Sequence, residues 1–128
     1  DGYPVLIASE SSLADLNQRM GRREGNLLPM NRFRPNVVLA GLPAWDEDHI
    51  ETVTIGSVAL RLVKPCVRCQ VTTTDQLSGT RLSEEPLVTL ARFRNNPDLG
   101  GVTFGWNAVV LRSGVVTGGD SVAVDYRF

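Results

Sequence analysis

The sequence predicts a mainly β domain, a β-barrel or closed sheet that carries about two short α-helices. Short apolar runs follow one another along the chain and are separated by glycine, proline and polar residues. Gly56-Ser57 lies between two such runs, and Gly118-Gly119-Asp120 lies between another two, which is the signature of a tight hairpin. Only two segments place apolar residues at helical spacing.

The first third of the chain predicts a strand, a helix and a second strand. Residues 3–8 form a short apolar run that is typical of a buried strand. Ser12 offers a hydroxyl cap with the carboxylate of Asp15 three residues on, so a helix is expected there. Its apolar stripe consists of Leu13, Leu16 and Met20. Residues 37–40 predict the second strand, and the acidic residues 46–48 after it a solvated loop.

The remaining elements are a short helix and five more strands, of which the last two form a closing hairpin. Residues 53–55 and 58–63 flank the first glycine turn. Pro86 stands near the first position of a helix whose apolar residues are Leu87, Leu90 and Ala91. The last predicted strands are residues 107–112, 114–117 and 121–124.

The composition of the chain limits the class of protein to which it can belong. The 128 residues are 42% hydrophobic, which fits one globular domain. Thirteen basic and 14 acidic residues leave a net charge of -1, so no overall charge attracts nucleic acid or anionic membranes. No apolar run approaches the roughly 20 residues of a membrane span, and no leader opens the chain, so we expect a cytoplasmic protein. Because it begins at Asp1, we expect a segment of a longer protein.

Both cysteines lie two residues apart in a strand-like context, as Cys66 and Cys69. Two small side chains buried in a strand are one interpretation. A structural zinc site needs about four Cys or His ligands, and His49 is the only histidine. Thioredoxin-like chemistry needs a helix start, whereas the residues after Cys69 are β-branched. The fourth interpretation is that one cysteine thiolate binds a high-valent metal whose other ligands come from an organic cofactor. The positive charges of Lys64 and Arg68 would favour deprotonation of the thiol.

An anion-binding segment precedes the second strand. Arg32, Arg34 and Asn36 flank an X-Pro step. We expect this step to hold the backbone extended just before the strand, so that the three side chains project from the start of the strand. Guanidinium groups bind phosphate oxygens bidentately. The competing interpretation is that both arginines are surface charges paired with carboxylates. Thr72 and Thr73 either hydrogen-bond a cofactor or reflect β propensity.

Taken together, these segments resemble the MOSC domain, the C-terminal domain of molybdenum-cofactor sulfurases, and the branch they resemble most is that of the amidoxime-reducing enzymes. The resemblance rests on the C-x-R-C-x-x-T-T-x-D motif of residues 66–75 and on the Arg-Phe-Arg-Pro-Asn segment of residues 32–36. It extends to residues 9–17, Glu85-Pro86-Leu87, Phe104-Gly105 and the closing Gly-Asp hairpin. It implies a barrel like that of pyruvate kinase.

The resemblance also implies a site and a reaction. Cys69 would be the molybdenum ligand and catalytic residue, and a molybdenum-pterin cofactor would contact Arg34, Asn36, Arg32, Thr72 and Thr73. The reaction would be reduction of N-hydroxylated substrates such as amidoximes or hydroxylamino purines. Electrons would come from an external reductase, an iron-sulfur or a flavin protein. Pyridoxal phosphate binding is a further property associated with the family.

The resemblance implies that residues 1–128 are one MOSC domain, the C-terminal or central part of a longer chain whose N-terminal β-barrel domain is missing. We therefore expect weak cofactor binding and low activity from the isolated segment. A second hypothesis is a sulfur-carrier or cofactor-delivery domain that uses a cysteine persulfide. A third is a cofactor-free barrel that only packs against its partner domain.

Overall fold

The computed structural model describes residues 3–68 and 85–127. Seven strands, two α-helices and two short 3-10 helices are described within these ranges. In chain order they are β1 (Val5–Ser9), α1 (Glu10–Arg19), η1 (Met30–Phe33), β2 (Val37–Leu39), η2 (Asp46–His49), β3 (Ile50–Ile55), β4 (Val58–Val67), α2 (Leu87–Phe93), β5 (Asn95–Asn96), β6 (Gly101–Arg112) and β7 (Ala123–Tyr126).

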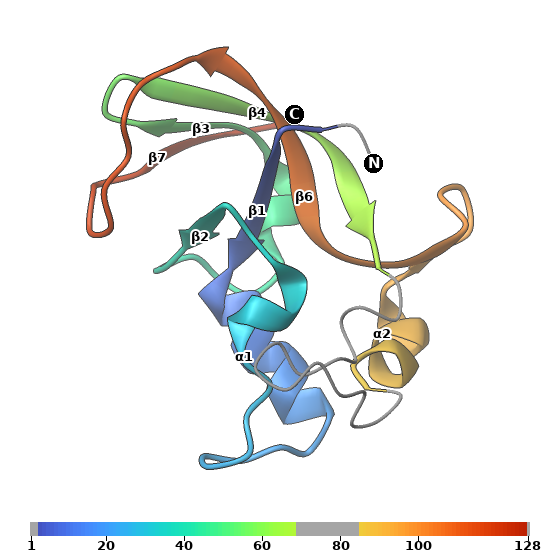
Figure 1. The fold of residues 1–128 in the computed structure, drawn as a ribbon. Helices are drawn as coiled ribbons and strands as arrows, with labels where there is room; N and C mark the ends of the chain where they lie inside the picture. Colours follow the sequence, from blue (N-terminus) through green and yellow to red (C-terminus); the bar gives the residue numbers. More distant parts are fainter. Residues whose placement is uncertain (1–2, 69–84, 128) are drawn as a thin grey trace.

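One sheet holds all seven strands, and it curls into a half-barrel with both helices at one end (Figure 1). Its order is β2-β1-β6-β4-β3-β7, and β5 pairs with β6 beside this path. All these pairs are antiparallel except β1 with β2. The predicted mainly β fold with two helices is therefore confirmed.

The first predicted hairpin is present and the second is not. Gly56 has φ +60, and Ile55 pairs with Val58 across the turn, as expected for a two-residue hairpin. The strand predicted for residues 114–117 was wrong: residues 113–122 are irregular and β7 pairs with β3. Asp120 closes this segment on itself, because its N–H donates to the Thr117 carbonyl and its carboxylate accepts from the Thr117 N–H.

α1 starts earlier than its sequence predicts. The cap is Ser9, whose hydroxyl accepts from the Ser12 N–H at 3.4 Å, so the proposed cap at Ser12 was wrong. The helix can begin there because β1 runs directly into it without a loop. α2 follows Pro86 as expected. Neither helix, nor any other helix in the described part of the chain, is long and apolar enough to cross a membrane.

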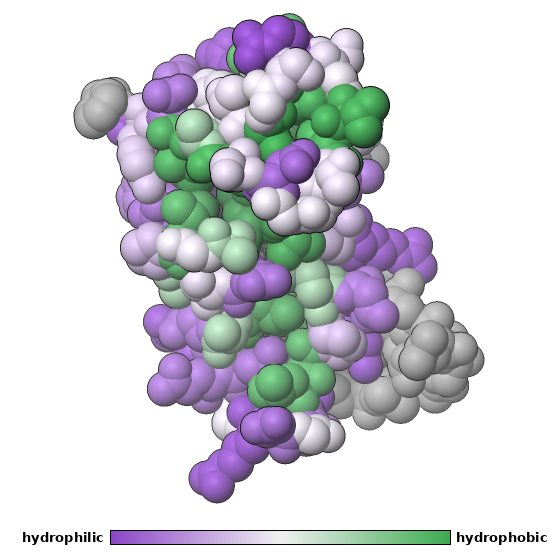
Figure 2. Space-filling view, turned by 90° about the vertical axis from the view of Figure 1, so that its left-hand side faces the viewer, coloured by the Kyte–Doolittle hydropathy of each residue, from purple (hydrophilic) through white to green (hydrophobic). Residues whose placement is uncertain are grey.

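The core has two parts. One lies inside the curled sheet, with β-branched residues and leucines from β1, β2, β3 and β4 and with Trp106 and Ala108 from β6. The other lies between η1, α1, α2 and the first half of β6; its buried members are Ala8, Leu16, Leu28, Phe33, Leu90 and Phe104. Apolar residues also reach the surface on the face that carries β2 and residues 113–122 (Figure 2).

Candidate functional site

Three of the predicted site residues fall within the described residues, and three do not. Arg32, Arg34 and Asn36 are described, whereas Cys69, Thr72 and Thr73 lie outside the described residues. The structure therefore describes the basic segment and the approach to the cysteine motif as far as Arg68.

η1 is fixed in place by an aromatic anchor. Phe33 is fully buried, and its ring stacks on Phe104 of β6 with centroids 4.0 Å apart. Trp45 meets the edge of Phe104 at 5.7 Å. A buried ring between two arginines in sequence determines where both arginine backbones lie, so Phe33 positions the basic segment.

The arginines on either side of this anchor have different surroundings. Arg32 is only 6% exposed, so it is not the surface charge of the competing interpretation. Arg34 is exposed and stands at the end of η1. Burying a guanidinium is costly unless anionic or polar groups surround it. This segment therefore offers one enclosed and one accessible cation.

The extended backbone expected before Pro35 was wrong. Arg34 has φ 53 and ψ 50, the left-handed conformation, and its N–H donates to the Asn31 carbonyl at 3.2 Å. It ends the 3-10 turn and redirects the chain into β2. A non-glycine residue in this region costs roughly 1–3 kcal/mol, and such residues cluster at functional sites.

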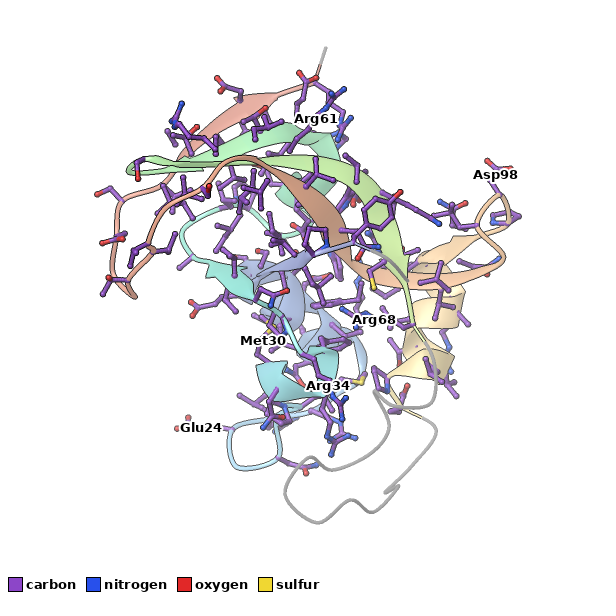
Figure 3. The ribbon with its side chains drawn as sticks, turned by 45° about the horizontal axis from the view of Figure 1, so that its top comes forward. Glu24, Met30, Arg34, Arg61, Arg68 and Asp98 are labelled. Carbon is purple, nitrogen blue, oxygen red and sulfur yellow. The ribbon has the colours of Figure 1, made fainter. Side chains whose placement is uncertain are left out.

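Arg68 ties the end of β4 to η1 and to β6. Its Nε donates to the Phe104 carbonyl at 2.8 Å, and its Nη1 donates to the Phe33 carbonyl at 2.9 Å. Its guanidinium also lies over the Phe33 ring, 5.2 Å from the centroid. Figure 3 shows the Arg68 side chain in the space between η1 and the end of β4. We call this set of contacts the Arg68 clamp.

A glycine makes room for the clamp. Gly105 follows Phe104 with φ +80, and a Cβ there would stand 3.0 Å from the Ile7 carbonyl oxygen and 3.3 Å from Nη2 of Arg68. The Phe104-Gly105 pair therefore accommodates the Arg68 side chain, which reaches it from the end of β4. Because Cys69 follows Arg68 directly in the sequence, the clamp connects the cysteine motif to the basic segment.

Sequence reasoning assigned Arg68 only an electrostatic effect on the cysteines and did not include it among the site residues. The signal that could have identified it was its place between the two cysteines, together with Phe104-Gly105 further along the chain. Neither signal says which carbonyls the guanidinium reaches.

The first cysteine of the motif, Cys66, is buried. Cys66 belongs to β4 and is 5% exposed, so its thiol is part of the interior. Its Sγ has a long contact of 3.7 Å with the Val67 carbonyl. A thiol enclosed in this way is poorly placed to meet a ligand.

Asn36 has a structural task. Its N–H donates to the Leu6 carbonyl at 2.9 Å, and its side-chain Oδ1 accepts from the Leu6 N–H at 2.7 Å. The side chain thus extends the pairing of β1 with β2. It lines hollows beside Val37 in which Arg32 and Arg34 take no part. Its predicted cofactor contact stays a prediction.

The acidic connection is not the solvated loop that was expected. η2 buries Glu47 completely, and its Oε2 accepts from the Ser12 hydroxyl at 2.5 Å. Burial raises the pKa of Glu47 above its usual range, because the charged form loses water. Ser12 also accepts from the Trp45 N–H at 2.8 Å, so this buried trio fixes η2 against α1. His49 is exposed.

Asp48, which is half-buried, forms a second polar group. Its carboxylate pairs bidentately with Arg94 at 2.6 and 2.9 Å and accepts from Trp106 Nε1 at 3.0 Å. Burial would raise the pKa of Asp48, but the bonds from Arg94 and Trp106 outweigh it and lower the pKa. Both acids serve the fold. Within residues 3–68 and 85–127, no three His, Cys, Asp or Glu side chains gather into a metal-binding group.

Comparison with known proteins gives the family. The MOSC domain model matches residues 1–123. The chain is 43% identical over 94 residues to bovine (Bos taurus) mitochondrial amidoxime reducing component 2, covering 73% of this chain and 27% of that protein. It is 42% identical over 94 residues to the human (Homo sapiens) mitochondrial amidoxime-reducing component 1, with the same coverage. The chain thus spans about a quarter of these relatives.

Two further similarities broaden the comparison. Molybdenum cofactor sulfurase of rice (Oryza sativa subsp. japonica) is 38% identical over 107 residues, which are 79% of this chain and 13% of that protein. The crystal structure of YiiM from Geobacillus stearothermophilus superimposes with a TM-score of 0.66 over 98% of this chain and 55% of that one, at 16% identity. The latter supports the fold alone.

Proposed function

This chain belongs to the MOSC domain family, and on that premise we propose that it is the molybdenum-cofactor domain of an oxidoreductase that reduces N-hydroxylated substrates to the parent amine. The support is the relation to two amidoxime-reducing components, together with a basic segment and a cysteine motif joined by the Arg68 clamp. The clamp is the observation that carries the proposal, because it joins two segments 30 residues and more apart in sequence.

The residues present fit a pterin cofactor with a terminal phosphate. Arg34 is exposed and carries a guanidinium, the group that binds phosphate oxygens, while Arg32 adds an enclosed positive charge two residues away in the sequence. Cys69 is the proposed thiolate ligand of molybdenum, with Thr72 and Thr73 as further cofactor contacts and Asn36 at the edge. When bound, the cofactor would supply the redox chemistry and accept the substrate oxygen.

The reaction needs a partner. Cleaving the N–O bond to give amine and water consumes two electrons and two protons, so an external reductase, an iron-sulfur or flavin protein, has to supply the electrons. The chain's contribution would be to hold the cofactor and orient the substrate. Cytoplasmic location stays a prediction, since the names of the animal relatives place those proteins in mitochondria. Pyridoxal phosphate binding also stays a prediction; within residues 1–128 the usual lysine partner of that cofactor would be the exposed Lys64.

Metal analysis tests this proposal. The full gene product is made in cells that synthesise the pterin cofactor, and molybdenum is measured per chain for the wild type, Cys69→Ala and the matched control Cys66→Ala. We expect molybdenum in the wild type and in Cys66→Ala and its loss in Cys69→Ala, with all three chains folded by circular dichroism. Molybdenum retained by Cys69→Ala would refute the ligand assignment.

The relation to rice molybdenum cofactor sulfurase favours a second candidate, a sulfur-carrier or cofactor-delivery domain. Here Cys69 would hold a persulfide rather than a metal. Mass spectrometry after incubation with a persulfide donor distinguishes the two. One added sulfur on Cys69, together with no molybdenum, would support carriage, whereas no adduct would argue against it.

A further inference from the structure

Two neighbouring hollows lie between β2 and residues 113–122. They have volumes of about 360 and 240 Å³ and share Asn36, Val37 and Val116 in their linings. Figure 2 shows hydrophobic atoms on the face that carries these segments. We call this feature the β2 groove.

The floor of the β2 groove is apolar, and its rim is mixed. The floor consists of buried core residues, namely Leu39, Ile55, Val58 and Leu60. The rim carries valines that are 42–45% exposed, namely Val38, Val110, Val116 and Val122, beside the polar Thr117 and Asp120. Scattered exposed apolar residues are ordinary, but a contiguous set around a hollow marks a contact surface.

The groove lies where the curled sheet remains open. β2 and β7 are the two ends of the strand order, and within the described residues each pairs with one strand only, β1 and β3 respectively. The larger hollow is lined by β2 on one side and by Val122, just before β7, on the other. An open edge next to an apolar floor is suited to accept another strand.

The similar proteins indicate where such a strand would come from. The chain matches 27% of the bovine and human relatives, and the superimposed YiiM chain is covered to 55%. Each of these proteins therefore contains a long stretch of polypeptide outside the part that this chain matches. A tethered segment also reaches the groove at a high effective concentration, which a free partner does not.

We propose that the β2 groove is the docking site of a β-strand supplied by the parent polypeptide outside residues 1–128. The strand pairs with the edge of β2 and lays alternate apolar side chains on Leu60 and Val116, which brings the half-barrel closer to closure. Its sequence therefore alternates apolar and polar residues. Arg32, Arg34 and Arg68 line neither hollow, whereas Asn36 lines both and thus borders the groove and the proposed cofactor site.

Photo-crosslinking in the full gene product tests the occupant directly. A benzophenone amino acid replaces Val116, which lines both hollows, or Val115, which is 86% exposed and lines neither, as the matched control. We expect position 116 to crosslink within the same chain to a segment outside residues 1–128, several times more than position 115. A crosslink between two copies, equal yields at both positions, or a gene product that ends at these 128 residues would each overturn the proposal.

A second measurement does not depend on the bulky probe. Val116→Asp in the full gene product places a charge in the groove, so the amides of Val37–Leu39 should exchange about tenfold faster, which corresponds to roughly 1.4 kcal/mol of lost protection. Val115→Asp should leave their exchange rates unchanged. Unchanged exchange in Val116→Asp would contradict strand addition at β2, while molybdenum content, measured in parallel, reports on the other site.

Discussion

The two halves of β6 are built differently. From Thr103 to Ala108 the strand is buried, and here it carries Phe104 under Phe33 and accepts the Arg68 side chain. Beyond Val109 it is exposed, with Val110 45% and Leu111 55% accessible beside the β2 groove. The same strand is closed by this chain's own side chains at one end and left open at the other. In our proposals, the closed half positions the cofactor site and the open half is a contact surface.

Removing the aromatic anchor should have the largest effect. Phe104→Ala deletes a fully buried ring that touches Phe33 and Trp45, so it should lower the free energy of unfolding by about 3–5 kcal/mol. Leu111→Ala, in the exposed half, should change it by less than about 0.5 kcal/mol. Chemical denaturation measures both; similar losses would contradict the contrast between the halves.

Asp48→Asn should have the next largest effect and lower the free energy of unfolding by about 3 kcal/mol at neutral pH. The substitution leaves the mostly buried Arg94 without its anion. The lowered pKa of Asp48 means that the carboxylate stabilises the fold above its unfolded pKa, near 3.8, and that this contribution is lost as pH falls through the folded value. The gap between wild type and variant should therefore be constant near neutrality and close in acid. If the difference in free energy of unfolding stayed constant down to the pH of acid unfolding, the Asp48 carboxylate would not stabilise the fold through its charge.

Gly105→Ala should lower the free energy of unfolding by about 2 kcal/mol, because it places a Cβ on a residue in the left-handed conformation and 3.0 Å from the Ile7 carbonyl oxygen. Gly119→Ala is the control: its φ of +92 is equally unfavourable, yet its Cβ would meet nothing within 4 Å. Thermal unfolding of both should place Gly105→Ala clearly below Gly119→Ala. Equal losses would show that the close approach at Gly105 is unimportant.

The sequence predicted the elements that depend on local chemistry. The Gly56 turn and the helix after Pro86 follow from backbone preferences, and they are found as expected. It did not predict that Ser12 would pair with Glu47 rather than cap α1, because that contact joins residues 35 apart. Likewise Arg68 was visible as a charge between two cysteines, but the carbonyls it binds belong to residues 33 and 104. Long-range hydrogen bonds leave no periodic signal in a single sequence.

We propose above all that the Arg68 clamp, by holding the end of β4 against the basic segment, allows the cofactor to bind. Molybdenum content of the full gene product tests it for Arg68→Met, Arg68→Lys and the control Arg112→Met, whose wild-type guanidinium bonds the Ser57 carbonyl at the open end of β6. Each variant is first checked for cooperative unfolding above the temperature of the assay. We predict at least about a tenfold loss of molybdenum in Arg68→Met, roughly 1.4 kcal/mol of binding, partial rescue in Arg68→Lys and none lost in Arg112→Met. Full molybdenum in a folded Arg68→Met protein would contradict the account.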